Sequence, residues 1–215
     1  MKTLTKEMQT SITPKMGLDL LIEGNKRFVN NLKINRNLLQ QANETSDGQH
    51  PFAVILSCID SRTSAELIFD QGLGDIFSVR IAGNIVNEDI LGSMEFGCKV
   101  AGAKIIVVLG HSKCGAVKGA CDRVEMGNLT SLLHKINPAV ESEKMTSENR
   151  NSGNAVFVEN VAALNVKLAV SNIMDASPIL SEMIKKGEIG IVGGMHDISN
   201  GLVTIFNDSI IINDK

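Results

Sequence analysis

The chain has 215 residues and a formal net charge of -3, with a pI of about 5.8. This length is enough for one domain with a sizeable core. The balanced charge indicates no nucleic-acid or membrane partner, and the absence of Trp and Tyr argues against a base-stacking platform. No apolar run reaches the roughly 18 residues of a membrane span. The polar start, Met1 to Pro14, lacks the apolar core of a signal peptide, so we expect a cytoplasmic protein.

The first 50 residues predict one amphipathic helix and a loop. Thr13-Pro14 is typical of a helix start, and apolar residues follow at helical spacing from Leu18 to Leu32. This stripe has no evident local partner, so the chain's own core and a second subunit are equally plausible partners. Residues 35–50 are polar and loop-like. We therefore expect a single domain over 1–215, with a helical arm and loop over 1–50 and an α/β zinc domain over 51–215.

The remaining chain alternates strands and helices. Strands are predicted over 52–57, 76–80, 104–109, 188–193 and 202–206, and residues 197–201 suit a hairpin turn before the last one. Helices are predicted over 63–70, 88–101, 115–126, 129–136, 155–175 and 178–186, with a polar loop over 144–154. The first and third strands are short, β-branched and almost uncharged, which is typical of strands buried on both faces of a parallel sheet. The pattern predicts an α/β fold with a mainly parallel central sheet flanked by helices.

Two motifs follow the first and third predicted strands. Cys58-Ile59-Asp60-Ser61-Arg62 follows one, and His111-Ser112-Lys113-Cys114 follows the other. Because ligands bind beyond the carboxyl ends of parallel strands, the two motifs should meet. Two cysteines, one histidine and an open fourth position are typical of a catalytic zinc site. The alternative is that Cys58 and Cys114 are buried as small hydrophobic side chains, and the spacing alone leaves both interpretations open.

Asp60 and Arg62 favour the functional interpretation. They are close enough in sequence for a charge-assisted pair, and charges at strand ends are costly unless they pair or serve a site. A purely structural ion pair is the alternative. We favour a role in which Arg62 keeps Asp60 ionised while Asp60 accepts a hydrogen bond from a zinc-bound water.

Other classes of enzyme fit the motifs less well. An alcohol dehydrogenase with the same zinc ligands needs a dinucleotide site, but no G-x-G-x-x-G opens a helix after a strand. The segment from Gly110 to Gly115 lacks the Gly-Lys-Ser/Thr ending of a phosphate-binding P-loop. A Cys–His nucleophile pair remains possible, although two cysteines that share one histidine fit a metal better.

These motifs resemble those of the β-class carbonic anhydrases, whose C-x-D-x-R and H-x-x-C patterns match the two stretches above. The resemblance covers about residues 17–206 and includes 23–28, 79–84, 133–140 and 159–161. It implies reversible hydration of carbon dioxide to bicarbonate and a proton at one zinc ion per chain. Cys58, His111 and Cys114 would be the zinc ligands. Zinc-bound hydroxide would attack carbon dioxide, and the Asp60–Arg62 pair would orient the zinc-bound water.

The resemblance also implies a substrate pocket and an assembly. Gln49 lies nine residues before Cys58, where plant-type members bind bicarbonate. Phe77, Ala82 and Phe96 fall where that type lines its apolar pocket, although Ala82 and Phe96 differ there in residue type. Gly115, next to Cys114, completes the expected substrate-binding set. The family builds this pocket across two chains, so we expect a homodimer or a homotetramer with Gln49 at the boundary.

Some bacterial members also bind bicarbonate at an inhibitory site through Trp, Arg and Tyr. Here Arg80 is present, but Ile55 replaces the Trp and His196 replaces the Tyr. We therefore expect a pocket of the plant type without this inhibition.

Two further functions remain open from the sequence. Similar folds hydrolyse carbonyl sulfide or carbon disulfide, and the shape of the pocket decides between these substrates and carbon dioxide. A zinc-stabilised interaction module without catalysis is the third hypothesis, and the Asp60–Arg62 pair and Gln49 argue against it.

Overall fold

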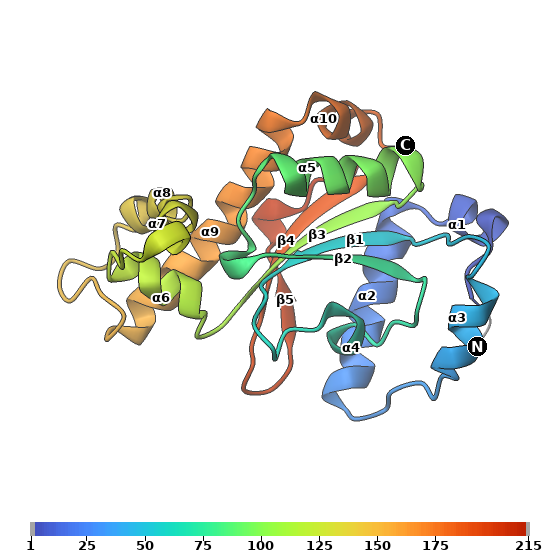
Figure 1. Ribbon diagram of the computed structural model, residues 1–215, viewed down its shortest axis with the longest axis horizontal. Helices are drawn as coiled ribbons and strands as arrows, with labels where there is room; N and C mark the ends of the chain where they lie inside the picture. Colours follow the sequence, from blue (N-terminus) through green and yellow to red (C-terminus); the bar gives the residue numbers. More distant parts are fainter. Residues whose placement is uncertain (1–2, 214–215) are drawn as a thin grey trace.

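The computed structural model describes residues 3–213, and its centre is one five-stranded sheet with the order β2-β1-β3-β4-β5 (Figure 1). The strands are β1 (Ala53–Ser57), β2 (Ile76–Arg80), β3 (Ile105–His111), β4 (Gly190–His196) and β5 (Val203–Ile205). The first four run parallel, and β5 pairs antiparallel with β4. The predicted mainly parallel α/β fold is therefore confirmed, as is the hairpin between the last two strands.

Helices cover both faces of the sheet (Figure 1). Their bounds are α1 (Lys6–Ser11), α2 (Pro14–Val29), α3 (Leu38–Glu44), α4 (Ala65–Ile68), α5 (Glu88–Glu95), α6 (Gly115–Cys121), α7 (Gly127–His134), α8 (Asn137–Ser142), α9 (Ala155–Ala176) and α10 (Pro178–Lys185). Short 3-10 turns span Ala82–Asn84 and Asn207–Ser209, and a π-helical turn over Phe96–Val100 continues α5.

The core forms because β1 and β3 are buried along their whole lengths. Successive side chains of a strand point to opposite faces of the sheet. Val54 and Val108 therefore lie in a cluster with residues of α5, α9 and α10. Ile55 and Val107 lie in the cluster on the opposite face, together with residues of α2.

Helix α2 packs on the sheet of its own chain. The Thr13 side chain accepts a hydrogen bond from the Met16 N–H, which confirms the predicted start of the helix. Leu18 and Leu21 are buried in the same cluster as Ile105 of β3. Of the two partners that the sequence left open for this apolar stripe, the structure shows the chain's own core.

The N-terminal 50 residues also contain two helices that the sequence analysis missed. In α1, buried Gln9 donates hydrogen bonds to the carbonyls of Pro51 and Ala101. In α3, Asn37 caps the helix start, and the Gln41 side chain accepts a hydrogen bond from the Leu73 N–H. Both helices are short and polar, so contacts distant in sequence stabilise them. The loop predicted over 35–50 is wrong for this part.

Three predicted boundaries shift, namely the carboxyl ends of β3 and β4 and the end of α6. β3 and β4 extend to His111 and His196, and the two histidines are direct neighbours in the sheet register. Helix α6 ends at Cys121 because Arg123 has a left-handed backbone conformation, with φ of 54°. His111 is thus the last residue of a strand, which gives its side chain a rigid base.

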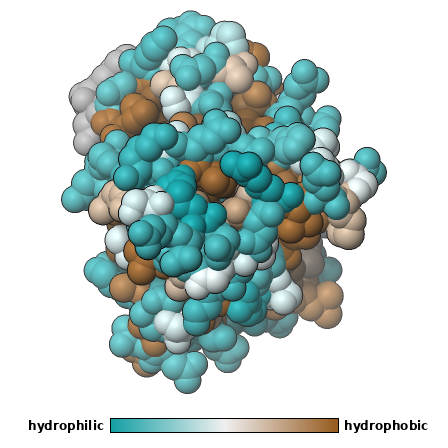
Figure 2. Space-filling view, turned by 90° about the vertical axis from the view of Figure 1, so that its left-hand side faces the viewer, coloured by the Kyte–Doolittle hydropathy of each residue, from teal (hydrophilic) through white to brown (hydrophobic). Residues whose placement is uncertain are grey.

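Helices α6 to α8 form a third cluster with α9 at one end of the molecule. Figure 2 looks onto this end, where the surface is mainly hydrophilic with separate hydrophobic areas. Among the helices of residues 3–213, α9 alone is long and apolar enough to cross a membrane. Half of its apolar window is buried, and α9 packs against β3 and β4. A core helix has the same composition.

Candidate metal centre

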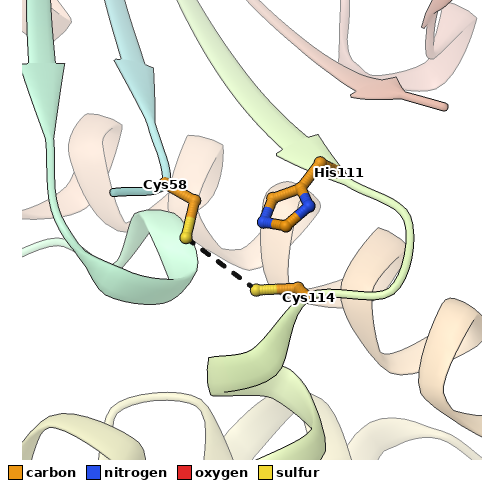
Figure 3. Close-up of side chains that lie close together, drawn as sticks. All are labelled: Cys58, His111 and Cys114. Atoms are coloured by element: carbon orange, nitrogen blue, oxygen red, sulfur yellow. Dashed lines mark hydrogen bonds between the residues drawn. The ribbon is translucent and has the colours of Figure 1, made fainter. Parts of the chain in front are cut away.

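The side chains of Cys58, His111 and Cys114 converge beyond the carboxyl ends of β1 and β3 (Figure 3). All three are buried, and their possible ligand atoms lie within 4.8 Å of one another. The two sulfur atoms are 4.0 Å apart. A tetrahedral zinc ion with Zn–S bonds of about 2.3 Å would separate its sulfur ligands by about 3.8 Å. The predicted meeting of the two motifs is therefore confirmed, with a spacing that fits zinc.

The local backbone explains how these ligands meet. Ser57 of β1 pairs with Leu109 of β3, so Cys58 and His111 leave adjacent strands at nearly the same level. The chain then turns at Lys113, which has a left-handed φ of 57°. This turn brings Cys114 to the start of α6, where it is the N-cap residue.

The hydrogen bonds of His111 leave one nitrogen free for a metal. Its Nδ1 lies 3.0 Å from the carbonyl oxygen of Ser112. A carbonyl oxygen only accepts, so Nδ1 carries the proton, and in a neutral ring Nε2 keeps a lone pair. Nε2 is buried and has no hydrogen-bond partner among the described residues. Buried polar atoms seldom lack a partner, and a bound metal would satisfy this one.

The opposite pKa shifts of the two thiols also favour a bound cation. Contact with the Cys114 thiol lowers the pKa of Cys58 well below its usual range, and the nearby His111 imidazole and the Gly83 N–H lower it further against the effect of burial. The Cys58 sulfur and burial together raise the pKa of Cys114 far above its usual range. The pair therefore loses one proton readily and the second only when a positive charge compensates it. Zinc supplies that charge and binds thiolates.

Asp60 and Arg62 form the predicted ion pair. The Arg62 Nε donates to Asp60 Oδ1 at 2.9 Å, and its Nη2 donates to Oδ2 at 2.7 Å. The Arg62 backbone N–H also donates to Oδ1. These bonds hold the pKa of Asp60 well below its usual range, so this carboxylate stays ionised. Oδ1 thus accepts two hydrogen bonds, whereas Oδ2 accepts one within the described residues.

Two residues that the sequence analysis did not assign to the metal site hold the first ligand loop. Arg80 donates from Nε to the Cys58 carbonyl at 3.0 Å and from Nη2 to the Asp60 carbonyl at 2.6 Å. The Thr63 hydroxyl donates to the same two carbonyl oxygens. No spacing rule identifies Arg80, because it comes from β2, which lies beside β1 in the sheet.

The structure separates the residues predicted to bind substrate. Gly115 follows Cys114 directly and faces open space. Ala82 precedes Gly83, whose N–H contacts the Cys58 sulfur. Phe77 and Phe96 instead pack edge to face, with ring centroids 6.3 Å apart, in a surface groove that includes none of the zinc ligands.

Gln49 is also remote from the cluster within one chain. It is exposed and precedes β1, whereas Cys58 follows that strand. The roles of Gln49, Phe77 and Phe96 in substrate binding therefore stay predictions that require a second chain.

The two positions that differ from the inhibited bacterial type are both buried. Ile55 lies in the core beneath α2. His196 lies beside His111 in the register of the sheet, and both of its ring nitrogens lack hydrogen-bond partners in the described part of the chain. Burial, followed by the nearby His111, lowers the pKa of His196 to about 4, so this imidazole is neutral.

Comparisons with known proteins agree with this site. The sequence model of a family described as carbonic anhydrase matches residues 53–203. Carbonic anhydrase 2 of Mycobacterium tuberculosis is 35% identical over 193 residues, which cover 84% of this chain and 87% of that protein. The match to the family model spans β1 to β4, the region that carries the candidate ligands.

Two solved structures share the fold. The β-carbonic anhydrase of Coccomyxa in complex with acetazolamide has a TM-score of 0.70 at 22% identity, and the match covers 88% of this chain and 86% of that one. A tetrameric β-carbonic anhydrase of Sordaria macrospora has a TM-score of 0.67 at 24% identity, covering 77% and 85%. With its fold, its C-x-D-x-R and H-x-x-C motifs and these relatives, the chain belongs to the β-class carbonic anhydrase family.

The metal content should follow the three ligands. We expect the wild-type protein to bind about one zinc ion per chain, and Cys58→Ala and His111→Ala to lose most of it, because each removes one of three protein ligands. Metal analysis after gel filtration measures this. Cys98→Ala is the matched control, since burial raises the pKa of this remote thiol to about 12. Undiminished zinc in either ligand variant would contradict the assignment.

Proposed function

We propose that this protein catalyses the reversible hydration of carbon dioxide to bicarbonate and a proton. The observation that carries the proposal is the buried Cys58–His111–Cys114 cluster beside an ionised Asp60 that Arg62 holds in place. Three protein ligands leave one coordination position for a reactant, which is typical of catalytic rather than structural zinc. Membership of the carbonic anhydrase family supports the same reaction.

One group of residues would bind the zinc ion, and another would orient the reacting water. Cys58 and Cys114 would hold the ion as thiolates, and His111 would hold it through Nε2. When bound, zinc supplies the Lewis acidity that makes a water molecule nucleophilic near neutral pH. Asp60 Oδ2 accepts a single bond, from Arg62, so it retains lone-pair capacity to accept a hydrogen bond from that water. This bond would aim the oxygen's remaining lone pair at carbon dioxide.

The activity should depend on both the metal and Asp60. We expect stopped-flow hydration of carbon dioxide by the wild-type enzyme to disappear after zinc is removed with a chelator. Asp60→Asn keeps the shape of the side chain but loses its charge, so kcat should fall roughly 10- to 100-fold while the zinc content stays the same. Asp208→Asn is the control, because Asp208 forms an exposed ion pair with Lys167. Full activity in Asp60→Asn, or in metal-free protein, would refute the proposed mechanism.

The pH dependence should show one smooth rise in hydration rate. Arg62 lowers the pKa of Asp60, so this carboxylate is ionised and paired above about pH 4 and loses that state only as the pH falls further. The titration that remains is that of the activated water. Its midpoint should lie somewhat above ~7, because two thiolates offset the positive charge of the metal.

The replacement of the Trp and Tyr of the inhibited bacterial type also supports a single smooth rise of the hydration rate with pH. A ligand shifts a conformational equilibrium only through contacts that differ between the two states, and Ile55 and His196 replace the residues that would make those contacts. A steep, cooperative loss of activity below neutral pH, together with Asp60 bound to the metal in a crystal at that pH, would show the opposite.

We also propose that the active protein is a homodimer or a homotetramer. The separation of Gln49, Phe77 and Phe96 from the metal ligands supports this proposal, because a second chain would have to bring them to the site. The related Sordaria enzymes are tetrameric. Light scattering of the active enzyme should therefore give a mass of two or four chains, and full activity in a monomer would contradict the proposal.

A cytoplasmic location remains part of the proposal. All four cysteines are free and buried, as is usual for proteins of a reducing compartment. Fractionation of the source cells tests this location.

A further inference from the structure

Helix α9 contacts the turn that carries two of the metal ligands and the glycine whose N–H bonds the sulfur of the third. Near its start, the Glu159 carboxylate accepts a hydrogen bond of 2.8 Å from the Lys113 N–H, inside the turn that joins His111 to Cys114. Two turns further along, Asn165 Nδ2 donates a hydrogen bond of 2.8 Å to the carbonyl oxygen of Gly83. One rigid helix therefore contacts the surroundings of all three ligands, although none of them belongs to it.

Gly83 connects Asn165 to the Cys58 sulfur. The Gly83 N–H donates to Cys58 Sγ at 3.3 Å. Its carbonyl, on the other side of the same Cα, is the group that Asn165 binds. Gly83 has a left-handed φ of 67°, and a Cβ there would lie 2.6 Å from a methyl group of Ile136. Only glycine fits this position, so the chain keeps a flexible residue where the sulfur needs a fixed donor.

Asn165 is a polar residue buried on an apolar helix face, which indicates that its hydrogen bond to Gly83 has a specific role. Asn165 is 5% exposed, and its neighbours on the buried face of α9 are apolar, among them Val161, Ala162 and Val166. Burying an amide is costly unless it is hydrogen-bonded. Among the described residues, the one hydrogen bond of the Asn165 side chain is the bond to Gly83. A leucine or valine would suit this face better if packing alone determined the residue.

We propose that Asn165 is a positioning residue for the metal centre, which fixes Gly83 so that its N–H stays bonded to the Cys58 sulfur. The amide restrains a glycine that would otherwise sample several backbone conformations. A thiolate that keeps a donor in place is preorganised for the ion, and partners of this kind outside the ligand shell affect metal affinity. This role rests on the zinc site of the proposed function and adds a residue to it.

The test compares two substitutions on the same helix. Asn165→Leu keeps the approximate size of the side chain but removes the donor. Asn172→Leu is the matched control, because Asn172 lines the same surface hollow as Asn165 and has no hydrogen bond to the ligand loops. Zinc affinity is measured by competition with a chelator of known affinity. The cobalt-substituted proteins report the geometry at the sulfurs through their thiolate-to-cobalt absorption bands.

We expect Asn165→Leu to bind zinc roughly 10-fold or more weakly and to shift the cobalt bands, whereas Asn172→Leu should match the wild type in both. Thermal unfolding of the metal-free proteins separates this effect from a general loss of stability. If Asn165→Leu does not fold, Asn165→Ala removes the same donor without adding bulk and is measured in the same way.

Wild-type affinity and an unchanged cobalt spectrum in Asn165→Leu would overturn the positioning role. Equal losses in the Asn165 and Asn172 variants would also overturn it, because the effect would then belong to the helix as a whole. Neither result affects the proposed function, which fails if the wild-type protein itself binds no zinc or does not hydrate carbon dioxide.

Discussion

The metal centre depends on two buried sulfur atoms held 4.0 Å apart beside an imidazole. Without a cation, the second thiol loses its proton only at a large cost, as the opposite shifts in the pKa values of Cys58 and Cys114 show. The His111 nitrogen that faces them is left without a partner. Because burial makes an uncompensated charge or an unpaired polar atom expensive, one divalent ion satisfies all three groups together.

The framework around this cluster consists mostly of bonds to the backbone. Arg80 and Thr63 fix the loop after β1, and Glu159 fixes the turn after β3. Asn165 holds the glycine that contacts the first sulfur. These four side chains come from three parts of the chain, since Glu159 and Asn165 both belong to α9, and each binds a peptide group in or beside a ligand loop. Such bonds keep the ligands in place before the metal arrives, which reduces the ordering that metal binding must provide.

The Asp60–Arg62 pair contributes through geometry more than through stability. The Arg62 side chain is 52% exposed, and an ion pair so open to water stabilises a fold little. Its two parallel bonds nevertheless fix the plane of the carboxylate and keep it ionised.

The ligand set and the fold class were predictable from sequence, because each depends on local patterns. The apolar runs before Cys58 and His111 identify buried parallel strands, and the ends of such strands share one edge of the sheet. Helices α1 and α3 were not predictable, since their polar residues are stabilised by partners far along the chain, such as the bond from Gln9 to Ala101. The roles of Arg80 and Asn165 depend in the same way on which strand and which helix lie beside the site. The sequence therefore determined which residues could bind a metal ion. The tertiary structure alone decided what holds them, because hydrogen bonds between distant segments exist only once those segments pack together.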